Sequence, residues 1–134
     1  MGDGALILLD THAALWNLGD SDRLSANARR AIAQAHRIGP VHIASITLLE
    51  VARLIAAKRL GTTVTLDTLL ANIEDAFAVL PITAAVAAAS TRLPASYPRD
   101  PADRIIGATA LVHGATLITA DQRIRKTKAV RTLW

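Results

Sequence analysis

Short aliphatic runs recur along this chain, and between them lie stretches with the apolar spacing or the end signals of a helix. These runs lie at residues 5–9, 41–44, 78–82 and 115–119, and a further short run lies at 130–134. Strands that alternate with helices favour a parallel sheet covered by helices on both faces. We therefore expect an α/β fold whose parallel sheet has four to five strands.

Residue types that begin and end helices mark the segments between these runs. We expect helices at residues 11–18, 25–39, 45–61, 65–77, 83–90 and 100–114. Ser25, Ser45 and Thr65 are N-cap candidates, because their hydroxyls accept hydrogen bonds from the free N–H groups of a first turn. Asp100 is a further candidate that precedes a proline, and Gly114 ends the same helix.

Composition narrows the class of protein. A chain of 134 residues predicts one domain over residues 1–134, and with 51% hydrophobic but only 3% aromatic residues its core is aliphatic. The absence of cysteine excludes disulfides, thiolate zinc sites and cysteine nucleophiles. The first apolar run is too short for a signal peptide or a membrane span, and no basic segment precedes it. We expect a cytoplasmic protein without a membrane partner.

Four acidic residues are placed to meet at one edge of the expected sheet. Asp10 ends the first strand, and Asp121 follows the fourth strand by one residue. Glu50 lies in the second turn of the helix after the second strand. Asp103 lies in the first turn of a helix that runs back toward the fourth strand, which returns it to the same edge. Ligands of parallel sheets bind outside the carboxyl ends of the strands.

Each of these acids also has a purely structural explanation. Asp10 is placed to cap a helix, Asp121 to hold a turn, Glu50 to pair with Arg53, and Asp103 to complete a capping box. Together, however, four clustered carboxylates repel one another unless a cation lies among them. Oxygen ligands without cysteine or paired histidines favour Mg²⁺ or Mn²⁺ over zinc. We expect His12 to border this site rather than to bind metal.

The segments LLDTHAALW, ITLLEVARL and RDPADRIIGATALVHGATLITAD, in this order and spacing, resemble those of PIN-domain nucleases. Within that family they are most similar to the VapC-type toxins of bacterial toxin–antitoxin pairs. The resemblance implies a PIN-like (Rossmann-like) sheet and a Mg²⁺- or Mn²⁺-dependent endoribonuclease. It assigns the catalytic and metal-binding roles to Asp10, Glu50, Asp103 and Asp121. Whether Asp100 joins the metal ligands or only caps its helix stays open at this point.

The net charge of +4 bears on the expected RNA substrate. An acidic pocket repels phosphates, so basic residues near the acids are candidates for contacts with the RNA backbone. The candidates are Arg104, Arg123, Arg125 and Lys126, with Arg99 and Lys128 nearby and with Thr119, whose hydroxyl the resemblance places near a metal-bound water. The few aromatic residues argue against an aromatic platform for single-stranded RNA.

The resemblance also implies two protein partners. It places a small VapB-like antitoxin in a groove between the helices at 11–18 and 45–61, and it implies a homodimer. These two helices carry large apolar residues beyond those that one sheet face needs. They are Leu15, Trp16, Leu48, Leu49 and Ile55.

Four alternatives compete with a toxin ribonuclease. A haloacid-dehalogenase-like phosphatase needs a second aspartate where His12 stands, and a response-regulator receiver needs a phosphorylated aspartate where Thr83 stands. A non-catalytic PIN-like RNA-binding module usually lacks one or more of the acids, all four of which are present here. A PIN nuclease of RNA maturation has no antitoxin, so a neighbouring antitoxin gene distinguishes it from a toxin.

Overall fold

A single parallel sheet organises the molecule, which is described here from a computed structural model covering residues 6–58 and 63–134. Its five strands lie in the order β3-β2-β1-β4-β5, and every neighbouring pair is parallel. The strands are β1 (Ile7–Leu9), β2 (His42–Ala44), β3 (Ala78–Leu80), β4 (Thr116–Ile118) and β5 (Thr132–Leu133). The expected α/β fold and all five expected strands are confirmed, although each strand is shorter than the aliphatic run that predicted it.

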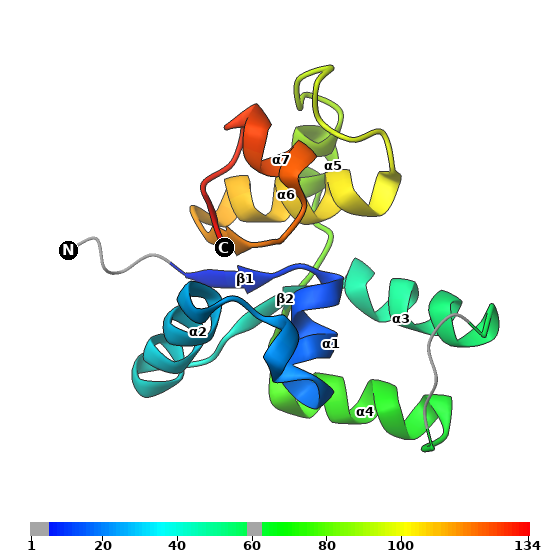
Figure 1. Cartoon of the computed structure of the whole chain (residues 1–134). Helices are drawn as coiled ribbons and strands as arrows, with labels where there is room; N and C mark the ends of the chain where they lie inside the picture. Colours follow the sequence, from blue (N-terminus) through cyan, green and yellow to red (C-terminus); the bar gives the residue numbers. More distant parts are fainter. Residues whose placement is uncertain (1–5, 59–62) are drawn as a thin grey trace.

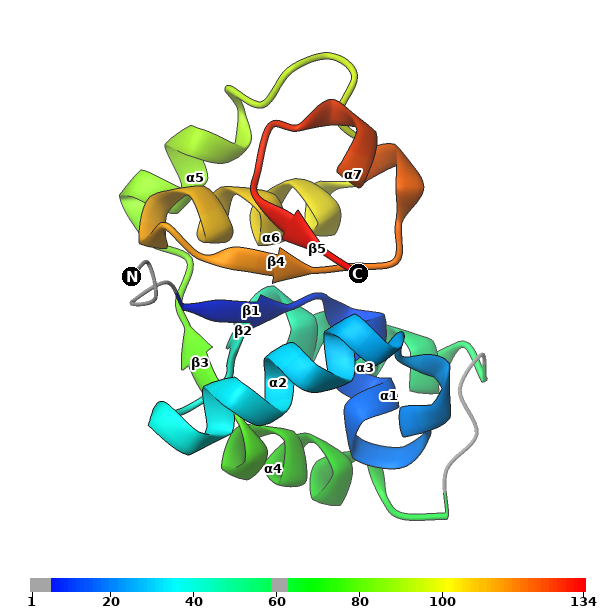
Figure 2. The same ribbon diagram turned by 60° about the vertical axis from the view of Figure 1, so that its left-hand side comes forward.

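Helices cover both faces of this sheet (Figures 1 and 2). One face carries α1 (Thr11–Gly19), α2 (Ala26–Ile38) and α4 (Leu66–Ala76), and the other carries α5 (Ala84–Ser90), α6 (Pro101–His113) and α7 (Gln122–Thr127). Helix α3 (Ile46–Ala56) leaves the carboxyl end of β2, and a short 3₁₀ helix, η1 (Ser21–Arg23), follows α1. No helix in the described ranges is both long and apolar enough to cross a membrane.

Two hydrophobic clusters pack on opposite faces of the sheet because successive residues of a strand point to opposite sides. Leu9, Ile43 and Ile118 belong to the cluster under α1, α2 and α4. Their neighbours Leu8 and Leu117 belong to the cluster under α6, which also contains Tyr97 and Ile106. Strands buried on both faces explain why the sequence shows continuous aliphatic runs rather than alternation.

The strand order reverses between β1 and β4, which are direct neighbours in the sheet. Connections from β1 to β2 and from β2 to β3 proceed in one direction, whereas the chain then returns to place β4 on the other side of β1. Such a reversal leaves a crevice at the carboxyl ends of the two central strands. Asp10 follows β1 and Asp121 lies just beyond β4, so both acids are brought to this crevice.

Most of the expected helix boundaries are confirmed by hydrogen bonds. Ser25 accepts from the Ala28 N–H at 3.0 Å, and Thr65 accepts from the Thr68 N–H at 3.1 Å. Asp100 accepts from the N–H of Asp103, the third residue of α6, at 3.0 Å. Gly114 ends α6 with φ of 62°, a left-handed conformation that glycine adopts at little cost.

The expected N-cap at Ser45 is wrong. Ser45 already has helical backbone angles, φ −59° and ψ −28°, and its side chain makes no cap hydrogen bond. Its N–H donates to the Leu80 carbonyl at 2.9 Å, so the chain passes from the sheet directly into α3 without an extended cap residue. Helix α3 ends at Ala56, and the expected end at Gly61 lies outside the described residues.

Helix α7 has no counterpart among the helices expected from sequence. It is only six residues long, and three of them are Arg123, Arg125 and Lys126, so it lacks the apolar stripe that marks an amphipathic helix. Its stability comes from its ends and from one buried residue. Asp121 caps its first turn, and Ile124 packs into the cluster under α6.

Candidate active site

The four acids expected to converge do line one pocket, at the carboxyl end of the sheet. This pocket has a volume of about 750 Å³ and is open to solvent on one side. The acids reach it from four different elements, namely the ends of β1 and β4 and the helices α3 and α6. The residues lining it are Asp10, His12, Trp16, Arg23, Glu50, Asp100, Asp103, Ala120, Asp121, Arg123 and Ile124.

Asp10 has both the structural role and the position expected of it. Its carboxylate caps α1 by accepting from the Ala13 N–H at 2.9 Å, and its own N–H donates to the Ile118 carbonyl at 3.1 Å. Burial raises the pKa of Asp10 above its ordinary value, an effect that the Thr119 hydroxyl and the Ala13 N–H oppose and that the charge of Asp121 reinforces. The capping role and a role in the pocket are therefore compatible.

Thr119 forms hydrogen bonds with both acids that follow the two central strands, Asp10 and Asp121. It is fully buried, and its hydroxyl accepts from the Asp121 N–H at 3.1 Å while also hydrogen-bonding to the Asp10 carboxyl group. A side chain without exposed surface does not reach an RNA backbone. The structure thus gives Thr119 a positioning role between Asp10 and Asp121 in place of the expected contact with substrate.

Glu50 is held by a residue that the sequence did not single out. The Thr11 hydroxyl donates to a carboxylate oxygen of Glu50, and it also lies 3.1 Å from the Thr47 hydroxyl. Both threonines are buried beneath the half-buried Glu50, so they anchor its carboxylate at the pocket. The signal for Thr11 was its place directly after Asp10, at the first position of the helix that Asp10 caps.

Asp103 carries the least compensated charge of the four. Its backbone N–H binds Asp100, but no hydrogen bond to its carboxylate is found within residues 6–58 and 63–134. Burial, followed by the charges of Asp100, Glu50, Asp121 and Asp10, raises the pKa of Asp103 to about 6. Like charges that crowd a half-buried carboxylate favour its neutral form unless a cation is added.

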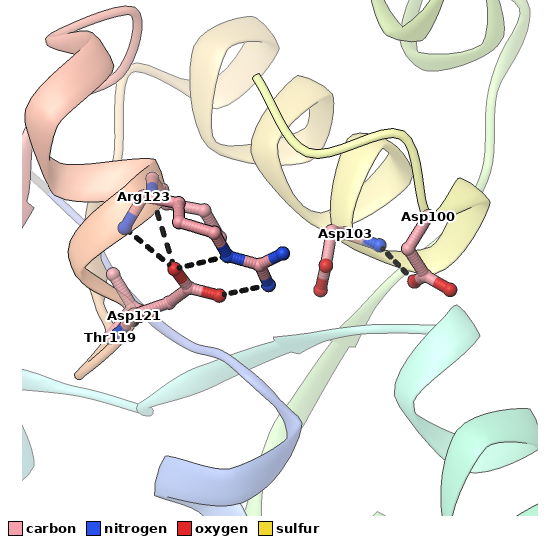
Figure 3. A network of polar contacts seen from close by, with 6 residues as sticks. Asp100, Asp103, Thr119, Asp121 and Arg123 are labelled. Atoms are coloured by element: carbon pink, nitrogen blue, oxygen red, sulfur yellow. Dashed lines mark hydrogen bonds and ion pairs between the residues drawn. The ribbon is translucent and has the colours of Figure 1, made fainter. Parts of the chain in front are cut away.

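Asp121 differs because a cation is already beside it (Figure 3). The guanidinium of Arg123 approaches with Nη2 2.9 Å from Oδ2 and Nε 3.4 Å from Oδ1, and the backbone N–H groups of Arg123 and Ile124 also donate to Oδ1. Burial alone raises the pKa of Asp121, but these hydrogen bonds outweigh burial and lower it. Figure 3 shows the guanidinium extended from α7 toward Asp103.

The donor set fits a divalent cation, although the acids are not gathered into a preformed metal site. Within the described part of the chain, no three acidic or histidine side chains are close enough together to hold a metal ion. Arg123 already engages Asp121, and Thr11 engages Glu50. Carboxylate oxygens are nevertheless the ligands that Mg²⁺ and Mn²⁺ prefer. Burial and then four neighbouring carboxylates raise the pKa of Asp103, so negative charge is crowded around it. Asp100 caps α6 and also lines the pocket.

Arg104 does not have the role expected of it. Its guanidinium donates to backbone carbonyls at 3.3 to 3.5 Å, and these belong to Ser90, Leu93, Pro94 and Tyr97. The side chain therefore braces the segment between α5 and α6 and is not available to an RNA backbone. Among the expected basic contacts, Arg99, Arg125, Lys126 and Lys128 are exposed, and Arg123 is exposed while paired with Asp121.

Most of the apolar residues expected in a partner groove serve the core instead. Leu15, Trp16, Leu48 and Ile55 are partly buried and pack against the cluster under α1, α2 and α4. Leu49 differs from them because it is 45% exposed. It lines a second pocket of about 440 Å³ between α3 and the start of α6, together with Ile46, Glu50, Arg53, Leu54, Ala57, Asp100, Pro101 and Ala102.

A five-stranded parallel sheet with acids at the crevice between its central strands places this molecule in a known class. The PIN domain model matches residues 7–130, and the chain belongs to the PIN-domain family. It is 37% identical over 130 residues to Ribonuclease VapC22 of Mycobacterium tuberculosis, and this match covers 96% of this chain and 98% of that protein.

Solved structures share the fold over nearly the whole chain. VapBC2 from Rickettsia felis, solved bound to a DNA fragment from its promoter, superposes with a TM-score of 0.72 at 13% identity, covering 96% of this chain and 97% of the other. DNA-bound VapBC from Salmonella typhimurium gives a TM-score of 0.72 at 17% identity, with coverage of 96% and 97%. At these identities the likeness is one of fold.

Proposed function

We propose that this protein is a metal-dependent endoribonuclease of the VapC type, a toxin that hydrolyses RNA phosphodiesters until a cognate antitoxin neutralises it. The observation that carries the proposal is the convergence of Asp10, Glu50, Asp103 and Asp121 from four separate elements on one open pocket. A relative that is 37% identical over nearly the full length and bears the name ribonuclease supports the activity.

The four carboxylates would hold Mg²⁺ or Mn²⁺. When bound, such an ion supplies a nucleophilic water at neutral pH and neutralises charge on the phosphate under attack. The protein contributes the arrangement of ligands. Thr119 fixes Asp10 relative to Asp121, and Thr11 orients Glu50. Asp103 accepts a cation most readily, because its charge has the least compensation.

RNA reaches this acidic pocket with the help of basic residues at its edge. Helix α7 begins directly after Asp121 and presents Arg123, Arg125 and Lys126 to solvent. Arg123, which pairs with Asp121 in this structure, would be free to contact a phosphate when Asp121 serves as a metal ligand. In this proposal the four acids bind the cation, and the basic residues of α7 bind the RNA backbone.

The antitoxin, in this proposal, occupies the second pocket, between α3 and α6. That pocket is lined by Leu49 and Leu54 and also by Glu50 and Asp100, which it shares with the acidic pocket. An apolar segment bound there would lie against the acidic site and block it. A homodimer, which the resemblance also implies, would use a surface that leaves this pocket free for the antitoxin. Neighbours whose names describe VapBC complexes support an antitoxin partner over an RNA-maturation nuclease without one.

The test compares wild type with Asp10→Asn in cells. Asparagine caps a helix as well as aspartate does, so α1 is retained while a metal ligand is lost. Wild type should arrest growth and create discrete new RNA 5′ ends, and the variant should do neither. In vitro, cleavage should stop with EDTA and return with Mg²⁺ or Mn²⁺. RNA binding without new ends in wild type would instead indicate a non-catalytic module.

A further inference from the structure

An aromatic cluster forms one wall of the acidic pocket. The Trp16 ring lies 5.8 Å from the His12 ring and 5.8 Å from the Trp134 ring, measured between centroids. The Arg23 guanidinium carbon lies 4.8 Å from the Trp16 centroid, within the range of a cation–π contact. His12, Trp16 and Arg23 all line the pocket that the four acids line.

Two neighbouring segments, α1 and η1, and the distant Trp134 assemble this cluster. His12 and Trp16 lie four residues apart on α1, which places them on one face of the helix directly after Asp10. The 3₁₀ helix η1 then turns the chain so that Arg23 returns over Trp16. Trp134 follows β5, and the Asn27 side-chain amide donates to its carbonyl at 3.4 Å.

Packing alone explains only part of the wall. Trp16 and Trp134 are partly buried and pack against the core cluster, as large apolar side chains do. His12 and Arg23, by contrast, are exposed. Within the described residues, no carboxylate oxygen comes within 4 Å of an Arg23 nitrogen, although Asp20 and Asp22 are its near neighbours in sequence. The Arg23 guanidinium thus stacks on the Trp16 ring without a carboxylate partner among the described residues, at the wall of a pocket whose lining includes five acidic residues.

We propose that His12, Trp16 and Arg23 form a nucleobase subsite, which holds an RNA base beside the phosphodiester that is cleaved. This inference rests on the proposed ribonuclease function and adds to it. Imidazole and guanidinium planes stack on the faces of bases, and the Arg23 charge draws in the neighbouring phosphate. The wall begins two residues after Asp10, so a base held there lies next to the acids that would bind the metal.

The low aromatic content of the chain pointed against stacking of this kind. A low aromatic content describes the average composition and not where the aromatic residues lie. The chain has two tryptophans, and the fold brings both into the same cluster. Because every base has an aromatic face, the subsite would set where the strand lies more than which base is chosen.

Tryptophan fluorescence tests the subsite, because Trp16 lies in it and Trp134, the other tryptophan, contacts Trp16. Full-length wild type in EDTA, where no cleavage is expected, is titrated with an eight-nucleotide oligoadenylate and with an abasic ribose–phosphate chain of the same length. The oligoadenylate should quench the emission and bind more tightly than the abasic chain. Equal affinities, or no quenching by oligoadenylate, would overturn the subsite.

Variants at Arg23 separate stacking from charge. Arg23→Ala should weaken oligoadenylate binding about tenfold, the scale of one base stacked on a side chain. Arg23→Lys keeps the charge but loses the planar group, so it should weaken oligoadenylate binding while leaving the abasic chain unaffected. Arg30→Ala, an exposed arginine of α2 outside the pocket, is the matched control. A similar loss for both ligands in Arg23→Lys would mean that Arg23 does not stack on a base.

The outcome also distinguishes this inference from the function on which it rests. If wild type cleaves RNA with Mg²⁺ but binds both chains alike, the subsite is wrong and the ribonuclease proposal stands. If wild type neither cleaves RNA nor binds either chain, both are wrong. Arg23 is exposed, so circular dichroism melting of its variants should match wild type and excludes unfolding as the cause of weaker binding.

Discussion

At the scale of single residues, the charge of Asp103 has a consequence for stability. Its pKa is raised to about 6 in the folded protein, against about 3.9 in an unfolded chain. Between these values the folded state binds more protons, so without metal the free energy of unfolding should increase as the pH falls from 7 toward 4. The contribution is on the order of 1–2 kcal/mol after allowance for solvent screening.

Urea unfolding in EDTA at pH 7 and pH 5 measures this effect. His42 works in the opposite direction, because burial lowers its pKa and the unfolded state then binds its proton more readily. The comparison is therefore made between wild type and Asp103→Asn, which share His42. The variant should lose most of the gain at pH 5. An identical pH dependence in the two proteins would show that the pKa of Asp103 is not raised in the folded state.

Arg123 should compete with the metal ion. Its guanidinium occupies Asp121 at 2.9 Å, so removing it frees a ligand. Arg123→Ala should bind Mn²⁺ about two- to fivefold more tightly in calorimetry, in keeping with the modest strength of an exposed ion pair. Arg125→Ala, which removes an exposed arginine of the same helix without touching Asp121, should leave Mn²⁺ affinity unchanged. Weaker Mn²⁺ binding by Arg123→Ala would contradict the competition.

At the scale of elements, α6 packs over Tyr97 at a point where only glycine fits. A Cβ atom added at Gly107 would lie 2.3 Å from the Tyr97 hydroxyl oxygen. Tyr97 is 1% exposed, and within the described residues its hydroxyl has no hydrogen-bond partner. Gly107→Ala should therefore reduce the free energy of unfolding by about 1–3 kcal/mol, as overpacked cores do.

A double-mutant cycle shows whether Tyr97 is the cause. Tyr97→Phe removes the unpartnered hydroxyl and should be close to neutral on its own. In the Tyr97→Phe background, Gly107→Ala should reduce the free energy of unfolding by less, because the Tyr97 hydroxyl oxygen, the atom nearest to the added Cβ, is absent. Gly19→Ala is the control, since nothing lies within 4 Å of a Cβ placed there. An equal cost for Gly107→Ala in both backgrounds would place the strain elsewhere.

Element boundaries could be predicted where the determining contacts are local. Ser25, Thr65 and Asp100 bond to N–H groups three residues away, and the sequence reveals such pairs directly. Ser45 failed as a cap because its N–H is taken by Leu80, a partner that only the folded sheet brings near. Helix α7 was missed for the same reason, since its buried Ile124 finds its neighbours only in the tertiary structure.

The features of the site also divide into those that the sequence predicted and those that it did not. The convergence of the four acids followed from their positions after the strands, because parallel strands bring their carboxyl ends to one edge. The roles of Arg104 and Thr119 did not follow, because they depend on carbonyls and carboxylates from other elements. Sequence position thus located the pocket, while the pairing of side chains within it required the structure.

At the scale of the whole molecule, Leu49 is the residue at which the proposed antitoxin site can be tested. It is 45% exposed in the second pocket, so Leu49→Asp should hardly affect folding. It should weaken association with an antitoxin's C-terminal segment by on the order of 2 kcal/mol in calorimetry. Leu111→Asp, at a residue of equal exposure outside both pockets, is the matched control. Unchanged affinity in the Leu49 variant would place the partner elsewhere.

The passage of the chain from one face of the sheet to the other has a practical consequence. Helices α1, α2 and α4 precede β3 and cover one face, whereas α5, α6 and α7 follow it and cover the other (Figure 2). A cut in the exposed residues 81–83 therefore leaves Asp10 and Glu50 on one fragment and Asp103 and Asp121 on the other. Neither fragment alone carries all four acids of the pocket. A version split at this point would act as a complementation reporter, in which RNA cleavage signals that two fused proteins have met.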